Sequence, residues 1–246
     1  MTDGAAVVTG AGGGLGASIA RRLGREGWSV VVNDVDHAAA HSVAEAIEHD
    51  GGRALALAAD ATNAQAVGDM VATAREQLGP VLATVANASG PQGEVSVDEL
   101  SWEYLLGHFE FFAKSPLALL HAVLPDMRAA GWGRVVHVGS DLFDRGARGW
   151  SAYIAAKGAL LGLTRGWAME LGGDGITVNL VAPGWIPVER HGVIAAEVEE
   201  DWFTRQPVPR WGTPDDVADA VAYLVSDGAG FVSGQRLVVN GGFHFA

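Results

Sequence analysis

Short apolar runs alternate along this chain with longer stretches in which apolar residues recur every three or four positions. The first run, Ala5 to Thr9, enters a glycine-rich turn. Leu15, Ile19 and Leu23 then recur at helical spacing until Gly27. Short apolar runs are typical of buried strands, and the second spacing gives one face of a helix. The segment up to Gly27 is therefore predicted to form a strand, a turn and a helix.

The same alternation continues along the rest of the chain. Further strands are expected at residues 29–32, 53–58, 81–86, 134–138, 177–181 and 236–239. Further helices are expected at residues 38–49, 63–78, 97–130, 153–171 and 214–224. This pattern predicts an α/β fold with one doubly wound parallel sheet, a Rossmann fold. We expect about seven strands with helices on both faces, in a single domain over residues 1–246.

Signals at the helix ends refine this prediction. In Thr62-Asn63-Ala64-Gln65 the threonine and the glutamine match a capping box. Thr213, followed by Pro214 and two aspartates, combines an N-cap, a first-turn proline and charges that the helix dipole favours. The long helix over residues 97–130 should be interrupted or bent at Pro116, because proline lacks a backbone N–H.

Composition and charge narrow the class of protein. The net charge is −13, from 16 basic and 29 acidic residues, which argues against nucleic acid because phosphate binding needs a basic surface. The chain has no cysteine, its start lacks the features of a signal peptide, and its apolar runs are far shorter than the roughly 20 residues of a membrane helix. We expect a soluble, cytoplasmic protein that contacts no membrane. The eight histidines lack zinc-site spacing, so no metal is expected.

The glycine-rich turn after the first strand is a candidate nucleotide site. Glycines there let the backbone approach a pyrophosphate at the positive end of the next helix. Asp34 closes the second strand 18 residues after Gly16, near the spacing at which a carboxylate holds the adenosine ribose hydroxyls. Because Asp34 would repel a 2′-phosphate, and neither Gly13 nor residues 35–40 include a Lys or Arg, NAD (NADH) is favoured and NADP is less likely. The alternatives are a tight structural turn and an ordinary loop carboxylate.

Three polar residues later in the chain form a candidate reacting centre. In a helix, Tyr153 and Lys157 lie one turn apart on the same face. An ammonium beside a phenol favours the phenolate, so Tyr153 could exchange a proton with an alcohol or a carbonyl. Ser140, at the end of the fifth strand, could donate a hydrogen bond to the same oxygen. Each residue alone is more typical of a helix surface or loop, and it is their combination with the glycine turn that points to hydride transfer.

With these motifs the sequence resembles the short-chain dehydrogenase/reductase family over nearly its whole length. Within that family, it most resembles the 3-oxoacyl-acyl-carrier-protein reductase-like branch. The resemblance implies that Ser140, Tyr153 and Lys157 are catalytic, and that Tyr153 and Lys157 also contact the cofactor. It implies further cofactor contacts at Thr9, Gly10, Gly14, Leu15, Gly16, Asp34, Asp60, Ala61, Asn87, Ala88, Pro183, Gly184 and Ile186. It also implies a homotetramer or homodimer that acts on a small-molecule alcohol or ketone.

The chain departs from the family pattern in ways that leave two functions open. No asparagine occurs between Trp102 and Leu124, where the family has one that holds a relay water. Its place falls near Phe112, and His108 and Glu110 are the candidate substitutes. Val188 replaces a usual threonine. The main hypothesis is an NAD-dependent oxidoreductase that interconverts a secondary alcohol and a ketone. The alternative is a dinucleotide-binding regulatory or structural protein with weakened catalysis.

Two features of the sequence bear on the substrate. The segment from Trp185 to Trp211 contains Trp202, Phe203 and His191 and is predicted to be an irregular substrate lid, or else an aromatic oligomer face. A substrate bound to an acidic carrier protein is discounted, because no basic residue stands at Gly131 or Met169. A hydrolase triad of Ser140 with His137 and Asp141 is disfavoured, since the chain has no Gly-x-Ser-x-Gly turn.

Overall fold

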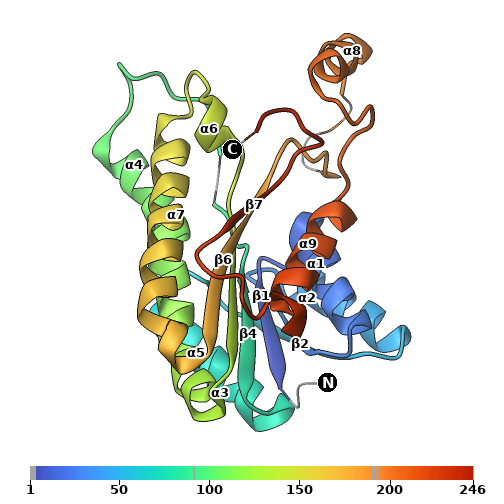
Figure 1. The fold of residues 1–246 in the computed structure, drawn as a ribbon, viewed down its shortest axis with the longest axis vertical. Coiled ribbons are helices and arrows are strands. Elements are labelled where there is room, and N and C mark those ends of the chain that lie inside the picture. The colour runs from blue at the N-terminus through green and yellow to red at the C-terminus, as the bar shows by residue number, and fades with distance from the viewer. Residues whose placement is uncertain (1–3, 91, 190–191, 193, 246) are drawn as a thin grey trace.

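All seven strands of the computed structural model lie in one parallel sheet, in the order β3-β2-β1-β4-β5-β6-β7 (Figure 1). The structure describes residues 4–90, 92–189, 192 and 194–245. The strands are β1 (Ala5–Thr9), β2 (Ser29–Asp34), β3 (Arg53–Ala58), β4 (Val81–Ala86), β5 (Gly133–Val138), β6 (Ile176–Pro183) and β7 (Arg236–Val239). The predicted strands are therefore present, and the doubly wound fold is confirmed.

Helices cover both faces of the sheet (Figure 1). Those that connect the strands are α1 (Gly14–Arg25), α2 (His37–His49), α3 (Ala64–Leu78), α4 (Trp102–Phe109), α5 (Ser115–Ala130), α7 (Ser151–Leu171) and α9 (Pro214–Val225). Helices α1, α2 and α9 pack on one face, while α3, α5 and α7 pack on the other. No helix in the described part of the chain is long and apolar enough to cross a membrane.

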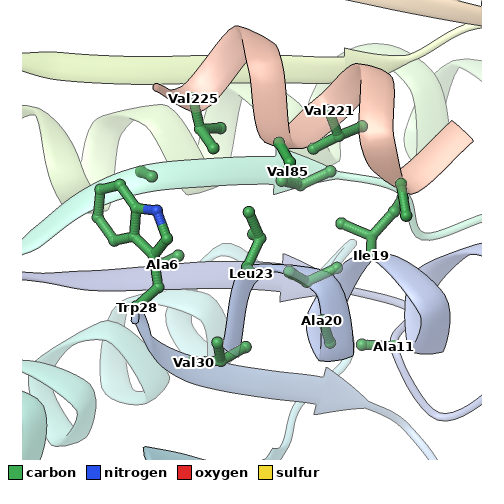
Figure 2. Packing of buried hydrophobic residues seen from close by; sticks show 14 of the residues in the cluster. Ala6, Ala11, Ile19, Ala20, Leu23, Trp28, Val30, Val85, Val221 and Val225 are labelled. Atoms are coloured by element: carbon green, nitrogen blue, oxygen red, sulfur yellow. The ribbon is translucent and has the colours of Figure 1, made fainter. Parts of the chain in front are cut away.

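The two faces of the sheet are buried in two hydrophobic clusters. Successive residues of a strand point to opposite faces, so Val7 packs in one cluster and Val8 in the other. On the first face, Leu23 of α1 and Val221 of α9 pack over the strands (Figure 2). On the second face, Trp167 of α7 is buried with residues of α3 and α5. Burial on both faces explains why the strands read as continuous apolar runs.

The predicted helix starts have different outcomes. At α9 the predicted N-cap is confirmed: the Thr213 side chain accepts a hydrogen bond from the N–H of Asp216, and the Asp216 side chain accepts one from the N–H of Thr213, which makes a capping box that was not predicted. At α3 the predicted capping box is wrong. Asn63 is the N-cap and accepts hydrogen bonds from the N–H groups of Gln65 and Ala66. Thr62 donates instead to the Asp60 carboxylate, so its hydroxyl oxygen is directed away from the helix end.

The single helix predicted over residues 97–130 is also corrected. Helix α4 begins at Trp102, after the Ser101 side chain accepts a hydrogen bond from the N–H of Tyr104. A π-helical turn, η1 (Glu110–Lys114), then separates α4 from α5. The interruption lies immediately before Pro116, which cannot donate a helical hydrogen bond to the turn preceding it. Residues 97–101 are not helical.

Two short helices were not predicted. Helix α6 (Leu142–Arg145) follows Ser140, and α8 (Ala196–Arg205) lies within the segment expected to be irregular. His191 of that segment lies outside the described residues. The 3-10 turns η2 (Gly172–Asp174) and η4 (Asp227–Ala229) complete the elements. Because β1 lies between β2 and β4, the chain order reverses at its carboxyl end, which is where ligands bind in folds of this type.

Candidate active site

A groove of about 920 Å³ contains most of the predicted site residues. The predicted residues that line it are Gly10, Gly14, Leu15, Gly16, Asp34, Asn87, Ser140, Tyr153, Lys157, Pro183, Gly184 and Ile186. The other four, Thr9, Asp60, Ala61 and Ala88, are not among its lining residues. The fold thus brings the glycine turn and the reacting centre, far apart in sequence, into one hollow.

The glycine turn has the shape that a pyrophosphate needs. Gly10 and Gly14 adopt left-handed φ angles of 63° and 52°, which favour glycine. A Cβ on Gly16 would lie 2.1 Å from the carbonyl oxygen of Gly10, so a side chain there would displace the turn. No side chain caps the start of α1 at Gly13. The first N–H groups of α1 therefore remain available to an anion at the positive end of the helix.

Thr9 and Asn87 hold this turn against the end of β4. The Thr9 hydroxyl accepts hydrogen bonds of 3.1 Å from the backbone N–H groups of Asn87 and Ala88. The Asn87 amide donates to the carbonyl oxygens of Thr9, at 3.0 Å, and Gly10, at 2.9 Å. Thr9 and Ala88 thus do not line the groove themselves, but their hydrogen bond helps to hold the glycine turn in place.

Two predicted carboxylates occupy different settings. The Asp34 carboxylate accepts hydrogen bonds from the N–H groups of Gly12, at 2.9 Å, and Asp36, at 3.1 Å, which ties it to the glycine turn. Asp60 is exposed, and its carboxylate accepts two hydrogen bonds from Thr62 that lower its pKa. Asp34 is therefore directed toward the groove, whereas Asp60 caps its own loop.

Ser140, Tyr153 and Lys157 come from the end of β5 and the first turns of α7. The Ser140 hydroxyl accepts a 3.1 Å hydrogen bond from the N–H of Leu142, which orients it. Lys157 is only 6% exposed, and its ammonium donates a 2.6 Å hydrogen bond to the carbonyl oxygen of Val138. The ammonium lies 5.6 Å from the centre of the Tyr153 ring, so the expected pairing of lysine and tyrosine is present.

Three aromatic side chains surround Tyr153. The rings of Trp150, Phe112 and His108 meet it nearly edge-on, with ring centres 5.6, 5.5 and 6.4 Å away. Phe112 also lies beneath Lys157, with 3.8 Å between the ammonium and the ring centre. These contacts hold the phenol in one orientation.

The suggested substitutes for the missing asparagine are placed differently. Glu110 pairs with Lys114 on the surface at 3.3 Å, one turn away, and does not line the groove. His108 is buried against Tyr153, and its Nδ1 lies 3.0 Å from the carbonyl oxygen of Tyr104. Phe112 itself fills the position that contacts Lys157.

The His137 ring contacts Thr164 and Trp167 of α7. It is fully buried, its Nδ1 lies 2.8 Å from the Thr164 hydroxyl, and its Nε2 has no hydrogen-bond partner among the described residues. Burial lowers its pKa to about 3, and the charge of Lys157 adds to this effect. A hydrolase relay between His137 and Ser140 has no support in these contacts. The described residues also contain no group of three or more histidine or acidic side chains placed to hold a metal.

The part of the groove lining outside the glycine turn and the reacting centre, here called its far half, is rich in aromatic side chains. It was only partly anticipated. Its lining includes Leu142, Arg145, Trp150, Trp185 and Trp202. Trp202 of α8 stacks with Phe243 near the C-terminus and packs edge-on against Trp185. Arg145 could have been suspected from its place on the loop after Ser140, because such loops form the crevice of α/β folds.

Asp141 joins this half of the groove to the C-terminal segment. It is 1% exposed, and burial raises its pKa, although Arg145, His244 and Asn240 oppose this. Its carboxylate accepts a 3.1 Å hydrogen bond from Nε of Arg145 and lies 3.5 Å from both His244 and Asn240. Asp141 therefore ties the loop that carries Ser140 to both α6 and the C-terminal segment.

Comparison with known proteins agrees with the fold and with the family that the sequence resembles. Residues 10–244 match the family described as enoyl-(acyl carrier protein) reductase. Cis-4-hydroxycyclohexanecarboxylate dehydrogenase of Sinomonas cyclohexanicum is 36% identical over 241 residues, which cover 97% of this chain and 95% of that protein. A 3-oxoacyl-[acyl-carrier-protein] reductase of Staphylococcus aureus is 33% identical over 242 residues, 97% of each chain.

Solved structures show the same architecture. A 7α-hydroxysteroid dehydrogenase complexed with NADH and 7-oxo glycochenodeoxycholic acid superposes with a TM-score of 0.92 and 34% identity, over 97% of this chain and 93% of that one. A gluconate 5-dehydrogenase from Burkholderia cenocepacia, in complex with NADP and tartrate, gives a TM-score of 0.91 and 28% identity, over 99% and 96%. The chain belongs to the short-chain dehydrogenase/reductase family of oxidoreductases.

Proposed function

We propose that this chain is an NAD-dependent oxidoreductase that interconverts a secondary alcohol and a ketone, with Tyr153 as the acid and base. The observation that carries the proposal is that one groove is lined by the glycine turn, Asp34, Ser140, Tyr153 and Lys157. The named activities of the relatives, all dehydrogenases or reductases, support it.

The residues take separate roles along the groove. The turn from Gly10 to Gly16 holds the pyrophosphate, Asp34 the adenosine ribose, and Pro183 to Ile186 the nicotinamide end. When bound, nicotinamide supplies or accepts the hydride. Tyr153 gives its phenolic proton to the carbonyl oxygen, or takes one from the alcohol. Ser140 donates a hydrogen bond to the same oxygen, while Lys157 stabilises the phenolate and holds the nicotinamide ribose.

The choice of NAD over NADP depends on Asp34. The solved relatives were bound to NADH in one case and NADP in the other, so the family alone does not decide. The Asp34 carboxylate closes β2 and accepts the N–H of Gly12, beside the turn that would hold the pyrophosphate. A second negative charge on the ribose would meet this carboxylate with no Lys or Arg among residues 35–40 to offset it.

The oligomeric state belongs to the same proposal. We propose a homotetramer or a homodimer, formed through the long helices and the C-terminal region. Large apolar side chains are exposed on these parts, namely Trp102, Met169, Phe231 and Phe245. Size-exclusion chromatography with light scattering tests this, and a monomer at micromolar concentration would contradict it.

The rival function is a dinucleotide-binding protein without efficient turnover. Phe112 favours it, because a phenyl ring cannot hold a relay water as an amide can. The deciding experiment compares wild type with Tyr153→Phe on a panel of cyclic and open-chain alcohols and ketones. We expect turnover by wild type and a loss of 10²-fold or more in Tyr153→Phe, with NADH binding retained. Tight NADH binding by wild type without turnover on any member of the panel would support the rival.

A further inference from the structure

Arg145 places an accessible positive charge in the half of the groove beyond Ser140. The groove has two basic lining residues among those described, Lys157 and Arg145. Lys157 is buried and directed to the carbonyl oxygen of Val138. The Arg145 side chain is 26% exposed, so it is the cation that a ligand in this half of the groove can reach.

The guanidinium of Arg145 is held by three separate parts of the chain. Its Nε donates to Asp141, which is buried beside Ser140. Its planar group lies 5.4 Å from the ring centre of Trp202 and 5.2 Å from that of Phe243. The Nη atoms have no hydrogen-bond acceptor among the described residues. A guanidinium that is oriented in this way, with free N–H groups, is suited to bind a carboxylate in two parallel hydrogen bonds.

The rest of this half of the groove suits an apolar body. Leu142 and the indoles of Trp150 and Trp185 line it. The groove lining also includes acidic residues, which would repel a carboxylate. Besides Asp34 at the glycine turn, there is Asp141, whose carboxylate is already paired with Arg145. Glu94 and Glu189 are exposed to solvent, where water screens their charge.

We propose that Arg145 binds a carboxylate of the substrate, so that the substrate is a hydroxy or oxo carboxylic acid with an apolar ring or short chain between its two polar ends. This inference rests on the proposed function. Arg145 is the last residue of α6 (Leu142–Arg145), and its Nε bonds Asp141, the residue that follows Ser140. The acid group therefore binds in the same groove as the oxygen that Ser140 and Tyr153 contact, with the apolar lining between the two.

The test uses a matched pair of ketones, 4-oxocyclohexanecarboxylate and its methyl ester, reduced with NADH. Wild type should prefer the acid, as measured by kcat/KM. Arg145→Gln should lower the acid-to-ester ratio of kcat/KM by about 10- to 100-fold, mainly through KM for the acid, because a charge-assisted pair is lost. Arg145→Lys should recover part of the ratio, and it keeps a cation beside buried Asp141 if the glutamine variant folds poorly. Arg148→Gln, which removes a nearby arginine outside the groove lining, should leave the ratio unchanged.

A second measurement is independent of turnover. Cyclohexanecarboxylate should bind to the NADH-loaded protein in calorimetry, and this binding should be lost in Arg145→Gln but not in Arg148→Gln. Equal use of acid and ester by wild type, or an equal loss on both in Arg145→Gln, would overturn the assignment of Arg145 while leaving the oxidoreductase proposal intact. Failure of wild type to reduce either ketone, with cyclohexanecarboxylate still bound through Arg145, would count against the proposed function alone.

Discussion

The ammonium of Lys157 lies 3.8 Å from the centre of the Phe112 ring and donates a hydrogen bond to the carbonyl oxygen of Val138. Phe112 is 3% exposed and belongs to the π-helical turn η1. A π turn widens the helix by one residue and is often found at functional sites. In this turn the Phe112 ring faces the ammonium of Lys157, and the same ring meets the Tyr153 ring edge-on.

Removing this ring should weaken catalysis without unfolding the chain. In Phe112→Leu the cation–π contact, worth roughly 0.5 to 2 kcal/mol, is lost, so kcat/KM should fall by about 2- to 30-fold. Phe112→Tyr, which keeps the aromatic face, should retain most of the activity. Steady-state kinetics with a ketone that wild type reduces measures both. Phe111→Leu, on the same turn, is the control, and an equal loss there would show that the turn rather than the contact matters.

Changing Asp34 should alter the choice of cofactor. In Asp34→Ala the hydrogen bonds that we assign to the ribose hydroxyls are lost, so NADH affinity should fall about tenfold or more, while NADPH affinity should rise because the repulsion is gone. Fluorescence titration with each cofactor gives both dissociation constants.

Asp36 provides the matched control for this experiment. Its side chain caps α2, accepting hydrogen bonds from the N–H groups of Ala38 and Ala39. Asp36→Ala should therefore cost about 1 kcal/mol of stability without changing the ratio of the two dissociation constants. Tighter binding of NADPH than NADH by wild type would refute the role of Asp34.

A methyl group on Gly16 should disrupt the glycine turn. Its Cβ would lie 2.1 Å from the carbonyl oxygen of Gly10 and 2.6 Å from the Asn87 amide, so the backbone must move. We expect Gly16→Ala to lower the melting temperature and to abolish measurable NADH binding. Gly68→Ala in α3 is the control, because a Cβ there meets no atom within 4 Å. Normal NADH binding by Gly16→Ala would show that the turn does not hold the cofactor.

Acid should destabilise the fold through His137. The unfolded chain protonates this residue near pH 6.5, whereas in the folded chain burial lowers its pKa to about 3. Between these values the unfolded state binds one more proton, so stability falls with decreasing pH by about 1.4 kcal/mol per unit from this group. The contribution is complete above pH 6.5. Urea unfolding at several pH values measures the slope.

The variant His137→Leu should flatten that slope. It is of similar size, and Thr164 can still donate its 2.8 Å hydrogen bond to the carbonyl oxygen of Leu160. Exposed His121, replaced in the same way, should leave the slope unchanged. If His137→Leu and wild type lose stability in parallel between pH 6 and 4, His137 is not the group responsible.

Local pattern was enough for much of the fold. Apolar runs located the strands, and the bounds of β1, β3, β4 and β7 agree with those expected. Fine detail at the helix starts was less predictable. At α3, Thr62 and Asn63 are both candidate caps by residue type. Thr62 donates its hydroxyl proton to Asp60, and it is the Asn63 side chain that accepts hydrogen bonds from the first helical N–H groups.

By itself, the sequence determined the alternation of strands and helices, the glycine turn and the spacing of Tyr153 and Lys157, because these depend on neighbours within a few residues. Only the tertiary structure decided that Phe112 lies under Lys157, that Arg145 faces the groove, and that Asp60 does not line it. Each of these depends on how segments far apart in the chain pack together. Such packing is set by the shape of the whole core, which no short pattern records.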